Sequence, residues 1–528
     1  MLLFKIILLF FSALSCSICL GFEQGKELAS SSLKEKSTWI EKIAADPATS
    51  SAQILEAWLI GKLFYWPQED RLVVAQKDGR SYLLLDLETG DALETVTRKQ
   101  VKKIKVNNKL RKQIKQTIAF LDLSSSNISK RSAAIAELKR KPDYSILQTL
   151  LKLETSNQTE NLASDLNNLI GLVLLRSNYE SEQMDGLNRL AGDLSASTKE
   201  ALSRFDRRQD LSDAARTTVT ERIEELNRKL KYWEYAQNVV FGLSLGSVLL
   251  LAAVGLAITF GVMGVINMAH GEFIMLGAYT TFVIQQLLPG SGAFSLWISI
   301  PTAFLVAGAA GVLLERTVIQ HLYGRPLETL LATVGVSLIL QQTVRSIFGP
   351  LNQSVATPEL LSGSLVINAA FAMTYNRIFV IIFAGLVVVG LWVLMYRTSF
   401  GIRIRAVTMN RGMASSMGVR TKRMDALAFG LGSGVAGMAG VAISQLTNVG
   451  PNLGQAYIID SFMVVVFGGV GNLFGTVIAA LTLGVANKLV EPLSGAVLAK
   501  ILILIFIIVF IQRRPRGLFA TKGRSAEG

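Results

Sequence analysis

The sequence predicts an all-α polytopic membrane protein of about nine transmembrane segments, some of them broken, preceded by an exported, mainly helical domain that carries a small β-hairpin piece. Charge is the first observation behind this prediction: residues 1–237 contain 35 Lys and Arg and 31 Asp and Glu, whereas residues 238–528 contain only 18 and 8. The second is a succession of apolar stretches in the later block, most of them near the roughly 20 residues of helix that cross a bilayer core. A single soluble enzyme is excluded, as is a chain that lies in the membrane throughout.

The first 21 residues are predicted to be a secretory signal peptide. Lys5 precedes a short apolar run over 6–14, and small residues follow it. A lipoprotein signal ending at Cys16 is the alternative, with alanine as a poor first residue of its recognition box. Both cysteines of the chain, Cys16 and Cys19, lie here. Cleavage near Gly21 therefore leaves a mature chain with no disulfide and no thiol chemistry.

Residues 22–237 are predicted to form an exported soluble domain. Within residues 70–97, two apolar runs flank Asp78-Gly79, a strong signal for the turn of a β-hairpin. Residues 107–235 carry helical patterns, including one helix pair near 131–151 of the HEAT or armadillo kind. The last helix has one apolar stripe, which is typical of a core-facing helix and leaves a partner-binding face as the alternative: Val219, Ile223, Leu226, Leu230 and Trp233.

This exported block has no histidine, no glycine-rich phosphate loop, no metal-spaced cluster and no nucleophile motif. An interaction or scaffolding role is therefore expected for it rather than catalysis.

Residues 238–512 are predicted to form a transmembrane domain. The predicted spans are 238–259, 264–287, 296–316, 328–347, 376–396, 425–446, 457–470, 473–490 and 497–512. The seventh is short and runs into Gly468-Gly469-Val470-Gly471, which is typical of a broken or re-entrant segment.

Charge also predicts the orientation of the chain, since cytoplasmic loops carry an excess of Lys and Arg. Residues 397–424 contain seven basic residues and no acid, and the tail 513–528 contains five against one acid. The opposite loops, 288–295 and 349–372, hold one charge between them. We therefore expect a multi-pass protein of the inner (cytoplasmic) membrane, in contact with lipid, with residues 22–237 periplasmic and a basic cytoplasmic tail. Because the basic excess lies beside apolar spans, no nucleic-acid partner is expected.

A short pattern occurs twice in the membrane block. Gly264-Val-Ile-Asn267 is followed by Gly271, and Gly469-Val-Gly-Asn472 is followed by Gly475. Glycine-interrupted helices at matching positions of two repeated halves mark the substrate path in many transporters.

Polar side chains near this pattern are the candidates for the substrate path, because polar groups in lipid surroundings need a partner or a function. The densest group is Asn267, His270 and Glu272, which either line a pore or gate, or hydrogen-bond the ends of the broken helix. Further candidates are Gln341, Gln342 and Asn472. No P-loop motif occurs, so ATP hydrolysis by this chain is not expected. No catalytic residue, metal ligand or cofactor is predicted, and the chain is expected not to be an enzyme.

The stretch from Asn267 to Tyr279 resembles the permeases of the branched-chain amino-acid and amide class of ABC importers. The resemblance covers about residues 235–520 and includes 242–247 and 513–519. Within that class, residues 315–317, 321–332 and 337–342 look like the urea permease, as does an exported N-terminal domain of some 200 residues. The resemblance implies three kinds of protein partner, namely a soluble periplasmic substrate-binding protein, a second homologous permease subunit and two cytoplasmic ATPase subunits.

The same resemblance implies an ATPase-coupling loop at 412–418, similar to the importer motif Glu-Ala-Ala-x-x-x-Gly. Ala414 and Gly418 match the motif, whereas Gly412 and Met413 depart from it. The small residues also favour a short helix that ends at a glycine.

The expected function is therefore the transmembrane permease subunit of an ATP-driven importer that translocates urea. A permease for branched-chain amino acids or short amides is the alternative. A passive channel or secondary transporter, and a membrane-tethered interaction protein, are two further functions that would need no ATPase subunits.

Overall fold

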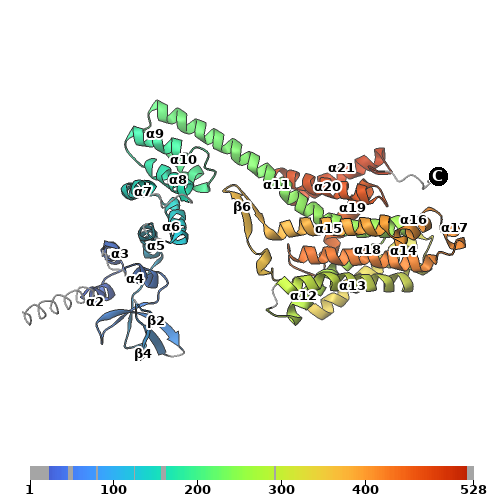
Figure 1. Cartoon of the computed structure of the whole chain (residues 1–528), viewed down its shortest axis with the longest axis horizontal. Coiled ribbons are helices and arrows are strands. Elements are labelled where there is room, and N and C mark those ends of the chain that lie inside the picture. The colour runs from blue at the N-terminus through green and yellow to red at the C-terminus, as the bar shows by residue number, and fades with distance from the viewer. Residues whose placement is uncertain are drawn as a thin grey trace, which may run out of the picture. The chain divides into compact units, whose positions relative to one another are not determined.

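The computed structural model describes residues 23–45, 51–78, 81–87, 89–123, 125, 127–155, 162–290 and 293–519 (Figure 1). The predicted signal peptide, the tip of the predicted hairpin at 79–80 and the end of the basic tail lie outside the described residues. The chain divides into two compact units, Met1–Arg228 and Lys229–Gly528.

The described residues of the first unit begin with three helices and a five-stranded antiparallel sheet. The helices are α2 (Glu23–Ser30), α3 (Lys36–Ala45) and α4 (Ser51–Leu59). The strands are β1 (Leu63–Trp66), β2 (Arg71–Asp78), β3 (Ser81–Leu85), β4 (Ala92–Thr97) and β5 (Lys102–Lys103), in the order β4-β3-β2-β1-β5. The predicted hairpin is confirmed as β2 and β3, which pair from Val74 with Leu85 to Asp78 with Ser81.

The sequence prediction missed β1, β5 and the three helices. All four residues of β1 are buried, so it lacks the alternation that identifies a half-exposed strand. Its Leu63 packs with Leu28, Trp58 and Ile104 in a core between helices and sheet.

The described residues that follow in the first unit are mainly helical. Their elements are α5 (Asn108–Asp122), α6 (Ile128–Arg140), the 3-10 turn η1 (Tyr144–Ile146), α7 (Leu147–Glu154), α8 (Ala163–Leu174), α9 (Glu180–Arg189) and α10 (Ala196–Asp206). The predicted helix pair corresponds to α6 and η1–α7. Asn107 and Asn127 cap α5 and α6 with their side-chain oxygens, as short polar residues at N-caps do. Leu150, Leu169 and Ile170 centre the apolar core of these helices.

Helix α11 (Asp213–Met263) begins in the first unit, and the division between the units falls within it. The Ser212 hydroxyl accepts a hydrogen bond from the Ala215 amide at 3.2 Å and so caps the start of the helix. Val219 and Leu226 of the predicted stripe are buried.

The second unit is a bundle of helices with a small hairpin. Its elements after α11 are α12 (His270–Leu287), α13 (Ala293–Thr317), η3 (Ile319–His321), α14 (Pro326–Phe348), η4 (Glu359–Leu361), β6 (Ser364–Asn368), β7 (Phe371–Thr374), α15 (Tyr375–Arg397), α16 (Ser399–Met409), α17 (Arg411–Ser416), α18 (Thr421–Ser444), α19 (Leu453–Gly468), α20 (Leu473–Ser494) and α21 (Ala496–Arg513). Each of the nine predicted spans overlaps one of these helices or α11.

Seven helical segments among the described residues are long and apolar enough to cross a membrane. They contain α11, α13, α14, α15, α18, α20 and α21. Helix α19 is apolar but has 16 residues, and α12, which begins with His270 and Glu272, is not among the seven. The count of nine predicted spans therefore corresponds to seven long segments and two helices of different character, as expected for a polytopic protein with some broken segments.

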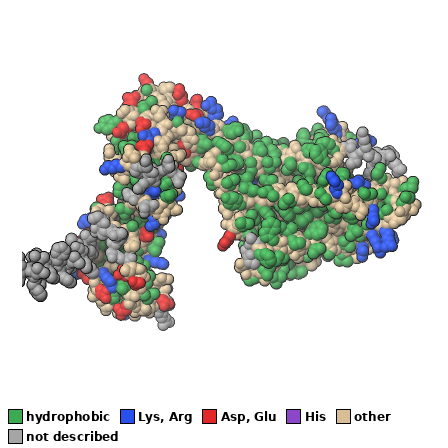
Figure 2. All heavy atoms as spheres, viewed as in Figure 1, with side chains coloured by type: hydrophobic (Ala, Val, Ile, Leu, Met, Phe, Trp, Pro, Cys, Tyr) green, Lys and Arg blue, Asp and Glu red, His purple; other side chains and the backbone are tan. Residues whose placement is uncertain are grey.

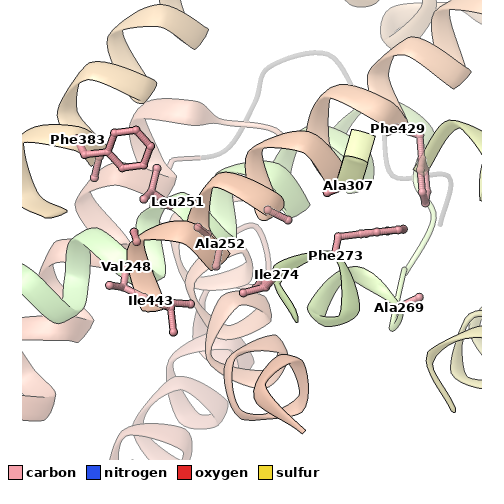
Figure 3. Close-up of a cluster of buried hydrophobic side chains, with 14 of the residues drawn as sticks. Val248, Leu251, Ala252, Ala269, Phe273, Ile274, Ala307, Phe383, Phe429 and Ile443 are labelled. Carbon is pink, nitrogen blue, oxygen red and sulfur yellow. The ribbon is translucent and has the colours of Figure 1, made fainter. Parts of the chain in front are cut away.

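Helix α18 lies at the centre of this bundle, with its most apolar stretch 83% buried, against 17% for α21. Figure 3 shows the core that surrounds it: Phe273 of α12, Ala307 of α13, Phe383 of α15 and Phe429 of α18 lie in one cluster. The outer surface of the unit is largely apolar, whereas Lys and Arg gather at the end that holds α16 and α17 (Figure 2). This distribution is what a lipid-facing bundle with one basic end requires.

Candidate functional site

Both copies of the repeated glycine pattern lie where a helix is interrupted. Helix α11 ends at Met263, Gly264 has a φ of 69°, and helix α12 begins only at His270. In the second copy α19 ends at Gly468, Gly469 has a φ of 104°, and α20 begins at Leu473. Positive φ values favour glycine, so the pattern encodes two breaks between helices.

Glu272 is the centre of a buried polar cluster between α12 and α14. Its Oε1 accepts hydrogen bonds from the Ser337 hydroxyl at 2.9 Å and from Gln341 Nε2 at 2.7 Å. Gln341 Nε2 also lies 3.1 Å from the Ser337 Oγ. All three side chains are buried, and Glu272 is only 1% exposed. A carboxylate at such a position costs several kcal/mol unless it is hydrogen-bonded, which explains the two donors.

The break that precedes α12 is held by Asn267 and by α14. Asn267 Oδ1 accepts a hydrogen bond from the Ala269 amide at 3.0 Å, and the Met268 amide donates to Thr333 Oγ1 at 3.2 Å. Both contacts satisfy backbone groups that a broken helix leaves without partners. The contact of Asn267 supports the structural interpretation, in which its side chain hydrogen-bonds the end of the broken helix.

His270 lies on the other side of the break, against α11. Its Nε2 is 2.9 Å from the Ala252 carbonyl oxygen, and its ring is fully buried. Because a carbonyl only accepts, the ring proton is on Nε2 and Nδ1 is the acceptor nitrogen.

Three buried polar atoms of this group have no hydrogen-bond partner within the described part of the chain: Asn267 Nδ2, His270 Nδ1 and Glu272 Oε2. Buried polar atoms are normally satisfied, so each of these three atoms lacks a partner that water or another polar group ordinarily supplies.

The other predicted path residues lie elsewhere. Gln342 is exposed on α14, one residue beyond the cluster. Asn472 caps α20 by accepting a hydrogen bond from the Gly475 amide at 3.1 Å. The sequence prediction missed Thr333 and Ser337. The signal was available, because Thr333, Ser337 and Gln341 recur every four residues and so share one face of α14.

Asn472 also contacts a C-terminal strap, residues 514–519, which lies against the second break. The Leu518 amide donates to the Phe467 carbonyl at 2.9 Å, and the Phe519 amide donates to the Gly468 carbonyl at 3.2 Å. The Asn472 Nδ2 donates to the Phe519 carbonyl at 3.4 Å. These bonds give donors to backbone carbonyls at the end of α19, which the interrupted helix would otherwise leave without partners.

The segment predicted to couple the protein to ATPase subunits forms helix α17. Asn410 caps it by accepting a hydrogen bond from the Met413 amide at 2.9 Å. Ala414 is buried and packs with Val407 of α16 and Met424 of α18. Gly418, with a φ of 84°, follows the helix, as expected for a glycine at a helix C-terminus.

The outer side of α17 is exposed. Met413 is 64% exposed and Met417 is 79% exposed. Gly412 lies on the same helix with open space beside it, since its nearest non-neighbouring atom would be the Asn410 side chain, 3.6 Å from an added Cβ. The buried Ala414 therefore holds α17 to the bundle, while the flexible methionines face outward, where they can adapt to a partner.

Comparison with known proteins agrees with this architecture. A family model described as branched-chain amino acid transport system / permease component matches residues 238–511. The chain is 29% identical over 296 residues to the permease protein BraD of Pseudomonas aeruginosa, which covers 54% of this chain and 96% of BraD. It is 31% identical over 275 residues to the permease protein LivH of Escherichia coli K12, which covers 50% of this chain and 87% of LivH.

The permease protein LivM of Escherichia coli K12 is 26% identical over 300 residues, which cover 52% of this chain and 68% of LivM. No solved structure matches the chain. The family match begins at residue 238, so the first unit lies outside it. Since the match spans more than half of the chain and nearly all of the helical bundle, the protein belongs to the family of branched-chain amino acid transport system permease components.

Proposed function

We propose that this protein is the permease subunit of an ATP-driven importer of a small polar solute, with branched-chain amino acids as the first candidate substrates. Helix α17 is the observation that carries the proposal. It is short, capped, fixed to the bundle by Ala414 and exposed at Met413 and at Met417, the residue that follows its end. A pure topology signal needs basic residues but no such shape.

The proposed machine contains partner subunits. The chain has no P-loop motif, so two cytoplasmic ATPase subunits supply the energy. LivH and LivM of one organism both match this chain, which supports a second homologous permease subunit beside it. A soluble periplasmic protein delivers the solute. The protein is placed in the inner membrane, with its first unit periplasmic and α17 cytoplasmic.

The comparisons favour branched-chain amino acids over urea, because BraD and LivH are both named as permeases of branched-chain amino acid transport systems. They replace urea, the first expectation from the sequence, as the leading candidate. One observation keeps urea as the second candidate. The polar side chains described around the first helix break include two ionisable groups, His270 and Glu272, and no Lys or Arg, whereas a zwitterion needs a cation for its carboxylate and urea needs only hydrogen bonds.

Uptake in cells that lack this gene, complemented with the full-length protein, tests the proposal. Labelled leucine and labelled urea are offered separately, with and without depletion of ATP. We expect one of them to accumulate only in complemented, ATP-replete cells. Uptake that persists without ATP would favour a passive channel or secondary transporter. Copurification of the ATPase subunits with the complemented protein distinguishes an importer from a membrane-tethered interaction protein.

A further inference from the structure

Arg411, the first residue of α17, makes a paired contact with a fully buried carboxylate. Its Nη1 lies 3.3 Å from Asp425 Oδ1, and its Nη2 contacts Asp425 Oδ2. Asp425 lies in the first turns of α18 and is 0% exposed. The two parallel N–H···O contacts use the fork of the guanidinium and fix its orientation as well as its distance.

The same guanidinium stacks on Tyr323, in the loop between α13 and α14. The Arg411 Cζ lies 4.5 Å from the centre of the Tyr323 ring. A second buried carboxylate, that of Glu315 on α13, is within electrostatic range of both Arg411 and Asp425. Burial, together with these two acids, raises the pKa of Tyr323 above its ordinary value. Arg411 thus joins α17 to α18 and to the 318–325 loop at once.

The contact between Arg411 and Asp425 resists separation for an energetic reason. Separating Arg411 from Asp425 would leave the buried Asp425 carboxylate without its charged partner, which is unfavourable because a buried charge needs one. A displacement of α17 is therefore less costly when α18 moves with it than when the pair breaks. The apolar packing of Ala414 against Val407 and Met424 supplies no directional bond comparable to the contact between Arg411 and Asp425.

Helix α18 is in close backbone contact with α12, the helix that carries Glu272 of the polar cluster. An added Cβ on its Gly440 would lie 2.6 Å from the Ala278 amide nitrogen of α12, so the two backbones touch. Helix α12 carries Glu272. Packed backbones of this kind move as rigid elements, which makes the sequence α17, α18, α12 a continuous mechanical connection.

We propose that Arg411 is the positioning residue that transmits movement of α17 to α18, through its paired contact with Asp425 and its stacking on Tyr323. This inference rests on the proposed importer function. It assigns to Arg411 the coupling of ATP hydrolysis to solute movement, and not the attachment of the ATPase subunits.

The test distinguishes transmission of movement by Arg411 from a role limited to neutralising the buried charge of Asp425. The double variant Arg411→Met/Asp425→Asn removes both charges and leaves neither orphaned. It is purified as the complete complex, reconstituted into liposomes and compared with the wild-type complex for solute taken up per ATP hydrolysed. We expect this ratio to fall roughly two- to thirtyfold while the ATPase subunits stay bound and ATP hydrolysis continues.

Two further variants keep the outcome decisive. Arg411→Lys keeps the charge but loses the fork and the stacking plane, so its ratio is expected to fall as well, even where the double variant does not fold. Arg403→Gln removes an exposed basic residue of α16 and is expected to match the wild type.

A double variant or a lysine variant with wild-type uptake per ATP overturns the inference, as does loss of the ATPase subunits from either variant. Failure of the wild-type complex to bind ATPase subunits, or to import in an ATP-dependent way, overturns the proposed function instead.

Discussion

The backbone of α11 at Gly261 touches the second helix break at Gly471. A Cβ added to Gly261 would lie 2.6 Å from the Cα of Gly471, closer than real Cβ atoms approach another heavy atom. Gly261 is three residues from the first break, at Gly264. The two interrupted segments of the repeated pattern therefore meet at one place in the bundle, where only glycine fits.

Replacing Gly261 by leucine is expected to force these two segments apart. Neither backbone can yield as a side chain would, and overpacking of this kind typically costs about 1–3 kcal/mol. We expect a lower melting temperature in detergent and loss of uptake. Gly385→Leu is the matched control, since Gly385 of α15 has open space beside it and should tolerate the change. Equal melting temperatures for the two variants would contradict the close approach.

Neighbouring glutamines on α14 provide a sharp test of the polar cluster. Gln341→Leu removes a hydrogen-bond donor from buried Glu272, whereas Gln342→Leu alters an exposed side chain. We expect Gln341→Leu to reduce uptake at least tenfold, because the loss of a hydrogen bond to a charged group is worth about 1.5–3 kcal/mol. Gln342→Leu should retain uptake. If both variants transport equally well, the cluster around Glu272 is not part of the solute path.

An acidic residue on the exposed side of α17 is expected to disrupt ATPase attachment. Met413→Glu replaces a flexible apolar side chain that is 64% exposed, so folding should be unaffected. We expect fewer ATPase subunits to copurify and uptake to fall in proportion. Tryptophan at Gly418 is a less specific probe because its φ of 84° disfavours any side chain, and Ala414→Trp would displace the packing with Val407 and Met424. If the Met413→Glu variant copurifies as many ATPase subunits as the wild type does, α17 is not the element that binds them.

The orientation of the chain is tested by proteolysis of spheroplasts. Added protease should trim the exported residues 22–237 and spare residues 397–424, because the latter are strongly basic and therefore expected in the cytoplasm. Fragments are identified with antibodies against each segment, and lysed spheroplasts show that both segments are cleavable. Cleavage of 397–424 in intact spheroplasts would reverse the membrane topology.

Lys36 is expected to destabilise the first unit at neutral pH. It is 4% exposed, and burial together with the nearby Lys102 and Lys105 lowers its pKa. A lysine whose pKa falls on folding binds its proton more weakly in the folded state, so stability rises as pH increases towards the unfolded pKa. Lys36→Met should raise the melting temperature of the first unit at pH 7 and weaken this pH dependence. Lys34→Met, at an exposed site, is the control and should change neither.

The elements that were predictable from sequence are those with a local signal. Asp78-Gly79 indicates the β2–β3 hairpin, and apolar runs locate the helices of the bundle. The repeated glycine pattern indicates both helix breaks, where the structure shows glycines with positive φ. Strand β1 was not predictable, because burial on both faces removes its alternation. The partners of Glu272 lie 65 and 69 residues away in sequence, so their spacing indicates a face of α14 but not what that face contacts.

The strap at 514–519 was hidden for a different reason. Its bonds to Phe467 and Gly468 join backbone groups. Because such groups do not depend on the type of residue, the sequence does not indicate these bonds. Gly517, buried with a φ of 73°, reflects the constraint, since a Cβ there would lie 2.7 Å from the Gly469 amide nitrogen.

The strap has a consequence for the order of events during synthesis. The ribosome makes Leu518 and Phe519 after all the helices described above, yet these two residues supply the donors for carbonyls at the end of α19. Helices α19 and α20 therefore enter the membrane before the connection between them has its final hydrogen bonds. The last of the described helices to be made, α21, is therefore complete before the connection between α19 and α20 can acquire its full set of hydrogen bonds.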